Sequence, residues 1–142
     1  MAVRQDPSGE LIARAPRVVK IPGVFSLGTG NASLFSWQNP ENMPILVTCA
    51  VHVTTQGSAG DAVNIGVVAN GTGAGTNIMT SLGITVSGTV INGWATGTGI
   101  QMMAEKGGTN DYLTGKVVSA GTGPSGTAVA DIYVIYFPTV FS

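Results

Sequence analysis

Residues 44–55 decide the fold class, and they read Pro-Ile-Leu-Val-Thr-Cys-Ala-Val-His-Val-Thr-Thr. Successive side chains of a β-strand point to opposite faces. One face of this stretch is apolar, with Ile45, Val47, Cys49, Val51 and Val53. The other face is mixed, with Leu46, Thr48, Ala50, His52 and Thr54. Because residues 45–56, the longest stretch without Gly or Pro, alternate with a period of two, not 3.6, the sequence predicts an all-β protein.

Short alternating segments separated by Gly- and Asn-rich turns continue through the chain. Eight or nine strands at this spacing are typical of an antiparallel β-sandwich, here jelly-roll-like. We expect residues 1–23 to form an extended N-terminal arm and residues 24–142 to form the sandwich domain. Residues 61–69 alternate in the same way, and a short polar loop joins them to residues 44–55. They are therefore expected to be the antiparallel partner of that strand.

The predicted core combines the apolar faces of three segments: Ile45, Val47, Cys49, Val51, Val53, Val63, Ile65, Val67, Ile132 and Val134. Two weaker segments complete the strand predictions. Residues 76–95 fit either one helical turn or short strands. Residues 100–106 fit a strand that places Ile100, Met102 and Ala104 on one face.

The last strand, residues 127–137, has two apolar faces. We assign Ala128, Ala130, Ile132, Val134 and Tyr136 to the core. The opposite face carries Val129, Asp131, Tyr133, Ile135 and Phe137. Asp131 favours this assignment, because a carboxylate is costly to bury. The second face is still very apolar for a solvent-exposed wall, so we expect the arm or a neighbouring subunit to cover it.

The composition indicates a surface that other subunits cover. Only 9% of the 142 residues are charged and the net charge is -1, against roughly 25% charged residues in ordinary soluble domains. Four of the six basic residues lie in residues 1–20, which carry a formal charge of +2. Such an arm suits an acidic protein surface or nucleic acid. Nucleic acid is disfavoured, because the arm has no aromatic side chain before Phe25 to stack on bases.

No catalytic, cofactor or metal site is predicted. The single histidine, His52, would have to meet both a nucleophile and a carboxylate in space to form a triad, and a half-exposed strand histidine is the simpler interpretation. The single cysteine, Cys49, is interpreted as a small buried side chain. No stretch reaches the length of a membrane span, and the charges from Arg4 to Arg17 argue against a signal peptide.

Several segments together resemble a known class of proteins: Trp37-Gln38-Asn39-Pro40 before the 45–54 strand, Val63 to Val67, Gly107 to Gly115, and Ala130 to Tyr136. The chain resembles small β-sandwich structural proteins of tailed bacteriophage virions, most closely the head decoration (cement) proteins. The resemblance implies a jelly-roll-like, trimeric subunit that clamps neighbouring major capsid proteins. It also implies a location on the capsid surface after synthesis in the host cytoplasm.

The resemblance and the composition together predict a structural protein that binds the outside of a phage capsid, not an enzyme. The partners would be the major capsid protein and further copies of the chain, with no membrane. The expected interface combines the arm with the outer face of the last strand: Arg4, Leu11, Ile12, Arg14, Arg17, Val18, Val19, Lys20, Ile21, Tyr133, Ile135 and Phe137. The alternative is a carbohydrate- or receptor-binding module of a fibre or baseplate, in which Trp37 and Trp94 contact the sugar.

Overall fold

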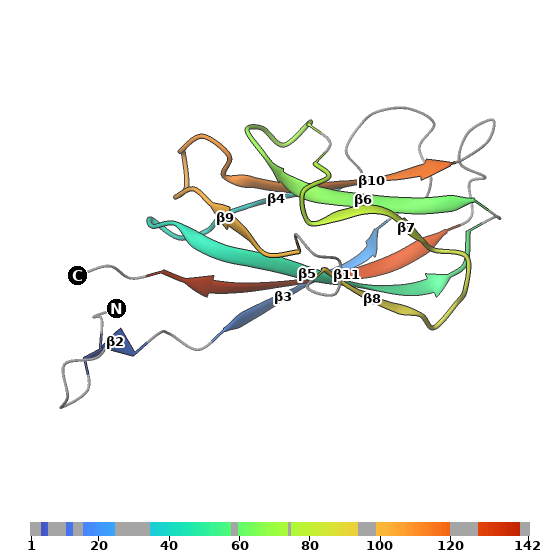
Figure 1. Cartoon of the computed structure of the whole chain (residues 1–142), viewed down its shortest axis with the longest axis horizontal. Coiled ribbons are helices and arrows are strands. Elements are labelled where there is room, and N and C mark those ends of the chain that lie inside the picture. Colours follow the sequence, from blue (N-terminus) through green and yellow to red (C-terminus); the bar gives the residue numbers. More distant parts are fainter. Residues whose placement is uncertain are drawn as a thin grey trace.

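The computed structural model describes residues 4–5, 11–12, 16–24, 35–57, 60–73, 75–93, 99–119 and 128–139. These residues form two antiparallel sheets that pack face to face (Figure 1). The described strands therefore confirm an all-β sandwich, and the two sheets contain nine strands between them.

The four-stranded sheet has the order β4 (Phe35–Gln38), β10 (Tyr112–Ser119), β6 (Asp61–Val68) and β7 (Met79–Gly83). The five-stranded sheet begins with β3 (Arg17–Val24), β11 (Val129–Pro138) and β5 (Ile45–Thr55). Both β8 (Val90–Asn92) and β9 (Gln101–Met103) then pair with the free side of β5. A separate pair near the N-terminus joins β1 (Arg4–Gln5) to β2 (Leu11–Ile12).

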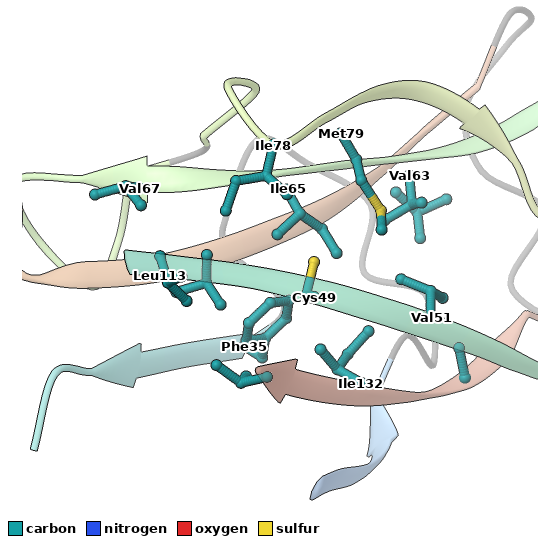
Figure 2. Packing of buried hydrophobic residues seen from close by; sticks show 14 of the residues in the cluster. Phe35, Cys49, Val51, Val63, Ile65, Val67, Ile78, Met79, Leu113 and Ile132 are labelled. Atoms are coloured by element: carbon teal, nitrogen blue, oxygen red, sulfur yellow. The ribbon is translucent and has the colours of Figure 1, made fainter. Parts of the chain in front are cut away.

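The core lies between the two sheets, where apolar side chains from both inner faces meet (Figure 2). All ten core residues predicted from the sequence are buried. The alternation of β11 is confirmed as well, because Ala130, Ile132 and Val134 are buried while the side chains between them are partly exposed. Phe35, Leu113 and Met79 add larger side chains from the four-stranded sheet.

The predicted pairing of residues 44–55 with residues 61–69 is wrong, because the two strands belong to different sheets. β5 pairs with β11, β8 and β9, whereas β6 pairs with β10 and β7. The connection crosses from one sheet to the other and is tight: a Cβ placed on Gly57 would lie 2.8 Å from an Asp61 carboxylate oxygen. The backbone N–H of Gly57 donates to the carbonyl of Ile84, which holds the crossing in place.

The structure also resolves the two weaker strand predictions. Residues 79–83 form a strand, not a helical turn. In β9 the buried side chain is Met103, whereas Ile100 and Met102 are each 52% exposed. The predicted face of Ile100 and Met102 is therefore the solvent-exposed face of the sheet.

A polar network closes one end of the sandwich and joins two loops. The buried amide of Asn39 donates to the carbonyls of Met43 (3.0 Å) and Ala104 (2.7 Å). The buried carboxylate of Asp111 accepts from Gln38 Nε2 at 2.7 Å and from the Gly107 backbone N–H at 2.8 Å. Because these buried polar groups have partners, the loops around them are fixed without the cost of an unpaired polar atom.

Part of the outer face of the four-stranded sheet is covered by the chain's own residues 70–73 and 75–78. The Gly75 backbone N–H donates to the buried hydroxyl of Thr114 (3.4 Å), and Asn77 Oδ1 accepts from the Val67 backbone N–H (2.8 Å). Gly75 lies so close to Gly66 that a Cβ on either residue would clash with the backbone of this crossing. The loop therefore lies between part of this sheet and the solvent, which distinguishes its outer face from that of the five-stranded sheet.

Candidate interaction surfaces

The N-terminal arm divides into two structurally different parts. β1 and β2 pair with each other, and β2 lies beyond the start of β3, apart from both sheets (Figure 1). β3, in contrast, is an edge strand that pairs with β11 over most of its length. Val19 and Ile21 pack against the core of their own chain. The part of the arm that extends away from the sandwich therefore precedes Arg17.

A β-bulge in β3 builds a polar site around Asp131. Ile21 lies opposite Ile132 and Val24 opposite Ala130, so Pro22 and Gly23 together face one residue of β11. The Gly23 backbone N–H donates to Asp131 Oδ1 at 3.0 Å, and Lys20 Nζ lies 3.0 Å from Asp131 Oδ2. These two hydrogen bonds, together with the positive charge of Lys20, lower the pKa of Asp131. Lys20 also lies over the ring of Tyr133, 5.7 Å from its centre.

Arg17 fixes the point at which the extended arm joins the sandwich. Its guanidinium forms an ion pair with the carboxylate of Glu41, which also accepts a hydrogen bond from the Tyr136 hydroxyl. The ring of Tyr136 in turn packs against Trp37, with 5.3 Å between ring centres. Arg17 and Lys20 thus both bind carboxylates of their own chain, and these ion pairs hold β3 on the sandwich.

The predicted interface residues therefore separate into three groups. Arg4, Leu11 and Ile12 belong to the distant β1–β2 pair, and Arg14 lies outside the described residues. Arg17, Val19, Lys20 and Ile21 make contacts within the chain, whereas Val18 is 61% exposed. Tyr133, Ile135 and Phe137 lie partly exposed on the outer face of β11.

That outer face of the five-stranded sheet is broader and more apolar than the sequence indicated. The described residues leave six large hydrophobic side chains exposed, and five of them belong to this face: Val18, Leu46, Val90, Ile100 and Met102. Four of these were missing from the predicted interface. Alternation shows which side chains share a face of one strand, but not which strands are neighbours, and only the pairing brings these residues together.

Charged residues gather at the opposite end of the same face. His52 lies directly opposite Asp131 on the neighbouring strand, and its charge helps to lower the Asp131 pKa. The carboxylate is already held by Lys20 and Gly23, so this arrangement resembles a structural ion cluster more than an acid–base pair. Across the described residues, no three His, Cys, Asp or Glu side chains gather in a way that could hold a metal ion.

Cys49 has the properties of a core residue. Burial raises the pKa of its thiol to about 12, so the reactive thiolate is scarce at neutral pH. The part of the chain that the structure describes also contains no helix long and apolar enough to cross a membrane.

The two tryptophans considered for sugar binding differ in what the structure shows. Trp37 is only partly exposed, and it packs against the hydrophobic core and Tyr136. Trp94 lies outside the described residues. Trp37 therefore packs at the edge of the hydrophobic core. This position weakens the interpretation of its ring as an exposed surface on which a sugar stacks.

Comparisons with known proteins assign no family to the chain. No family model and no curated protein matches it. Among solved structures, the chain is similar to the VP2 subviral particle of infectious bursal disease virus, with 16% identity and a TM-score of 0.33. The match covers 99% of this chain and 46% of the other, so the chain spans less than half the length of that protein. A TM-score this low supports no inference about fold or function.

Proposed function

We propose that this chain is a structural virion protein that binds the outside of a bacteriophage capsid and holds neighbouring major capsid subunits together. The observation that carries the proposal is the β1–β2 pair, which lies away from a sandwich that is complete without it. A two-residue strand pair of this kind is not stable alone in water. We therefore expect a partner surface to hold it in the assembled particle.

The binding energy of the arm must come mainly from apolar burial and strand pairing. A segment that becomes ordered on binding loses about 1–2 kcal/mol of backbone entropy per residue. Exposed ion pairs return only about 0–1 kcal/mol each, so Arg4 and Arg14 cannot hold the arm on their own. Leu11 and Ile12, which are already in an extended conformation, can supply both apolar contact and an edge for strand addition.

A protein that binds only the assembled lattice stabilises that lattice by mass action. Several arms acting together would raise the affinity of an oligomer well above that of one arm. The homotrimer expected from the sequence remains a prediction.

The test compares the full chain with a chain that lacks residues 1–15. This deletion keeps β3 and its contacts with Glu41 and Asp131, so the sandwich should still fold. In co-sedimentation with undecorated capsid shells, the full chain should bind and the shortened chain should not. A matched control, Arg4→Ser with Arg14→Ser, keeps the arm and removes its charges, and we expect it to bind only slightly less tightly.

Two results would contradict the proposal. Equal binding of the full and shortened chains would show that the arm does not bind the capsid. A steep loss of binding with added salt would show that charge dominates, and would favour nucleic acid as the partner. The alternative function, a sugar- or receptor-binding module, predicts instead that glycans bind to the sandwich and that the arm deletion leaves this binding intact.

A further inference from the structure

The outer face of the five-stranded sheet carries large side chains on one strand and small ones on the next. On β11 the outward residues include Tyr133 and Ile135, and directly opposite them on β5 lie Ala50 and Thr48. Ala50 and Thr48 are nearly inaccessible although they point outward. Ala50 lies between Tyr133 and Asn92, and the hydroxyl of Thr48 donates to the Gly99 carbonyl of the same chain. The face therefore has a ridge along β11 and a shallow furrow along β5.

We propose that this face packs against the same face of a second copy of the chain, about a twofold axis that runs along the strands between β5 and β11. This pairing goes beyond the proposed capsid binding and does not rest on it. A twofold interface places one surface patch against itself, so the patch has to be self-complementary. The strand register of this sheet shows how that condition is met.

A twofold axis between β5 and β11 exchanges these two strands and keeps each residue at its level along the sheet. The ridge of one copy then lies over the furrow of the other, with Tyr133 above Ala50 and Ile135 above Thr48 of the second copy. The axis also exchanges the two edges of the sheet. Val18 on β3 pairs with Ile135, which pairs with Thr48. Ile100 directly precedes Gln101, the partner of Val47, so extending this register by one residue places Ile100 next to Thr48 beyond β5. Val18 of each copy therefore meets Ile100 of the other.

The charged end of the face matches itself in the same way. Asp131 and His52 are cross-strand neighbours on β11 and β5, so the axis places the Asp131 of each copy over the His52 of the other. Asp131 and His52 would then alternate around the axis, and each Asp131 would keep its ion pair with Lys20 of its own chain. An axis perpendicular to the strands would instead bring the charged end of one copy over the apolar end of the other, which is unfavourable.

The size of the face approaches what a stable pair requires. With strands about 4.8 Å apart and about 3.4 Å per residue, the 35 residues of β3, β11, β5, β8 and β9 span roughly 570 Å² before side-chain relief is counted. A typical specific interface buries about 800 Å² on each partner. The strand directions of two aligned, packed sheets differ by up to about 30°. The side chains of the two copies therefore fit best at the centre of the face and less closely at Val18 and Ile100.

Within the described residues, the other outer face offers no equivalent surface. The segment 75–78 lies across the four-stranded sheet, where Gly75 contacts Gly66 and Thr114. The one exposed large hydrophobic side chain of the described residues that is not on the five-stranded face, Val86, lies in the segment between β7 and β8. It provides a control, because it is 59% exposed and belongs to none of the strands of the proposed contact.

A charge-restoration experiment on the full chain tests the pairing by sedimentation equilibrium over a range of protein concentrations. The unmodified chain should have the mass of two copies. Val18→Glu and Ile100→Lys should each weaken the pairing at least about tenfold, a change of about 1.4 kcal/mol. The double variant should recover most of that loss, since the axis places the new carboxylate of each copy opposite the new ammonium group of the other. Val86→Glu should leave the mass unchanged.

We expect the variants to fold, because Val18 and Ile100 are both exposed. A urea denaturation curve of each variant checks this. Within one chain the two positions are separated by β11 and β5, so their effects on folding should simply add. Recovery of the pairing in the double variant must therefore arise between copies.

Three results would overturn the proposal: a monomer or a trimer in place of a pair, additive weakening in the double variant, or equal sensitivity to Val86→Glu. A monomer that still binds capsid shells through its arm would overturn the pairing and leave the proposed function standing. A pair of copies that fails to bind capsid shells would overturn the proposed function and leave the pairing standing.

Discussion

The substitution Ile132→Ala, compared with Ile135→Ala, tests whether the two faces of β11 have the roles assigned to them. β11 lies between β3 and β5, and Ile132 is fully buried among core residues from both sheets. Truncating a buried isoleucine to alanine removes its transfer free energy and leaves a cavity, which together cost about 2–5 kcal/mol. Ile135 lies three positions further along, on the outer face, and is only partly buried. Its truncation should cost about 1 kcal/mol or less.

Both substitutions are best measured in a Val18→Glu chain, because the proposed pairing would otherwise bury Ile135 as well. Urea denaturation followed by tryptophan fluorescence gives the free energy of unfolding of each variant. Total stability of a domain is about 5–15 kcal/mol, so the Ile132→Ala loss should be a large and easily resolved fraction. Equal losses at the two positions, or a larger loss at Ile135, would refute the assignment of the inner and outer faces.

Three further predictions concern other parts of the molecule. Gly75→Ala should destabilise the fold by about 1–3 kcal/mol, because the new Cβ meets the Gly66 backbone, whereas Gly83→Ala, which has open space, should change the denaturation midpoint little. Burial opposes ionisation of Asp111, but the hydrogen bonds that its carboxylate accepts outweigh burial and lower its pKa. Ionised Asp111 therefore adds to the free energy of unfolding above about pH 4, and this contribution is lost as the pH falls further. Asp111→Asn should therefore flatten the acid limb of a stability–pH curve, and an unchanged limb would contradict this. Cys49 should react with a thiol reagent only after denaturation, and rapid labelling of the native protein would show that it is not buried.

The alternation of side chains predicted the faces of the strands well, but not how the strands are arranged. Val47 and Val51 were assigned to the core correctly because a strand with one apolar face has a single sensible orientation. The same pattern gave the wrong partner for β5. Two strands joined by a short loop can form a hairpin within one sheet or an arch between two facing sheets, and both place the apolar faces inward.

The connection between β5 and β6 shows why the arch was not recognised. Glycines in a polar loop are typical of hairpins, and Gly60 does have a positive φ of 92°. What makes this loop an arch is tertiary: Gly57 donates to Ile84, which belongs to a segment far along the chain. No local pattern in residues 56–61 carries that information.

The candidate surface was predicted in part, for a similar reason. Phe137 and Ile135 were identified because β11 is apolar on both faces. Leu46 and Met102 were not, because each sits in a strand whose pattern was explained without a contact surface. Register places Phe137 beside Leu46 and Leu46 beside Met102, so the apolar end of the face depends on three strands at once.

The arm was also predicted with a boundary at residue 23, and β3 shows where intrachain packing begins. Val19 and Ile21 alternate with Val18 and Lys20, which is the pattern of a strand with one face on a core. The basic residues at 17 and 20 suggested a partner protein, but their carboxylate partners, Glu41 and Asp131, are supplied by the same chain. Distant ion pairs of this kind are not encoded in the local sequence.

The most direct test of the central claim is a cryo-electron microscopy reconstruction of the intact particle. We expect density for the sandwich outside the capsid shell, with residues 1–15 extended along a neighbouring major capsid subunit and Leu11 and Ile12 in contact with it. Density for the sandwich at the tail fibre or baseplate, or an arm folded onto its own sandwich with no contact to a capsid subunit, would contradict it.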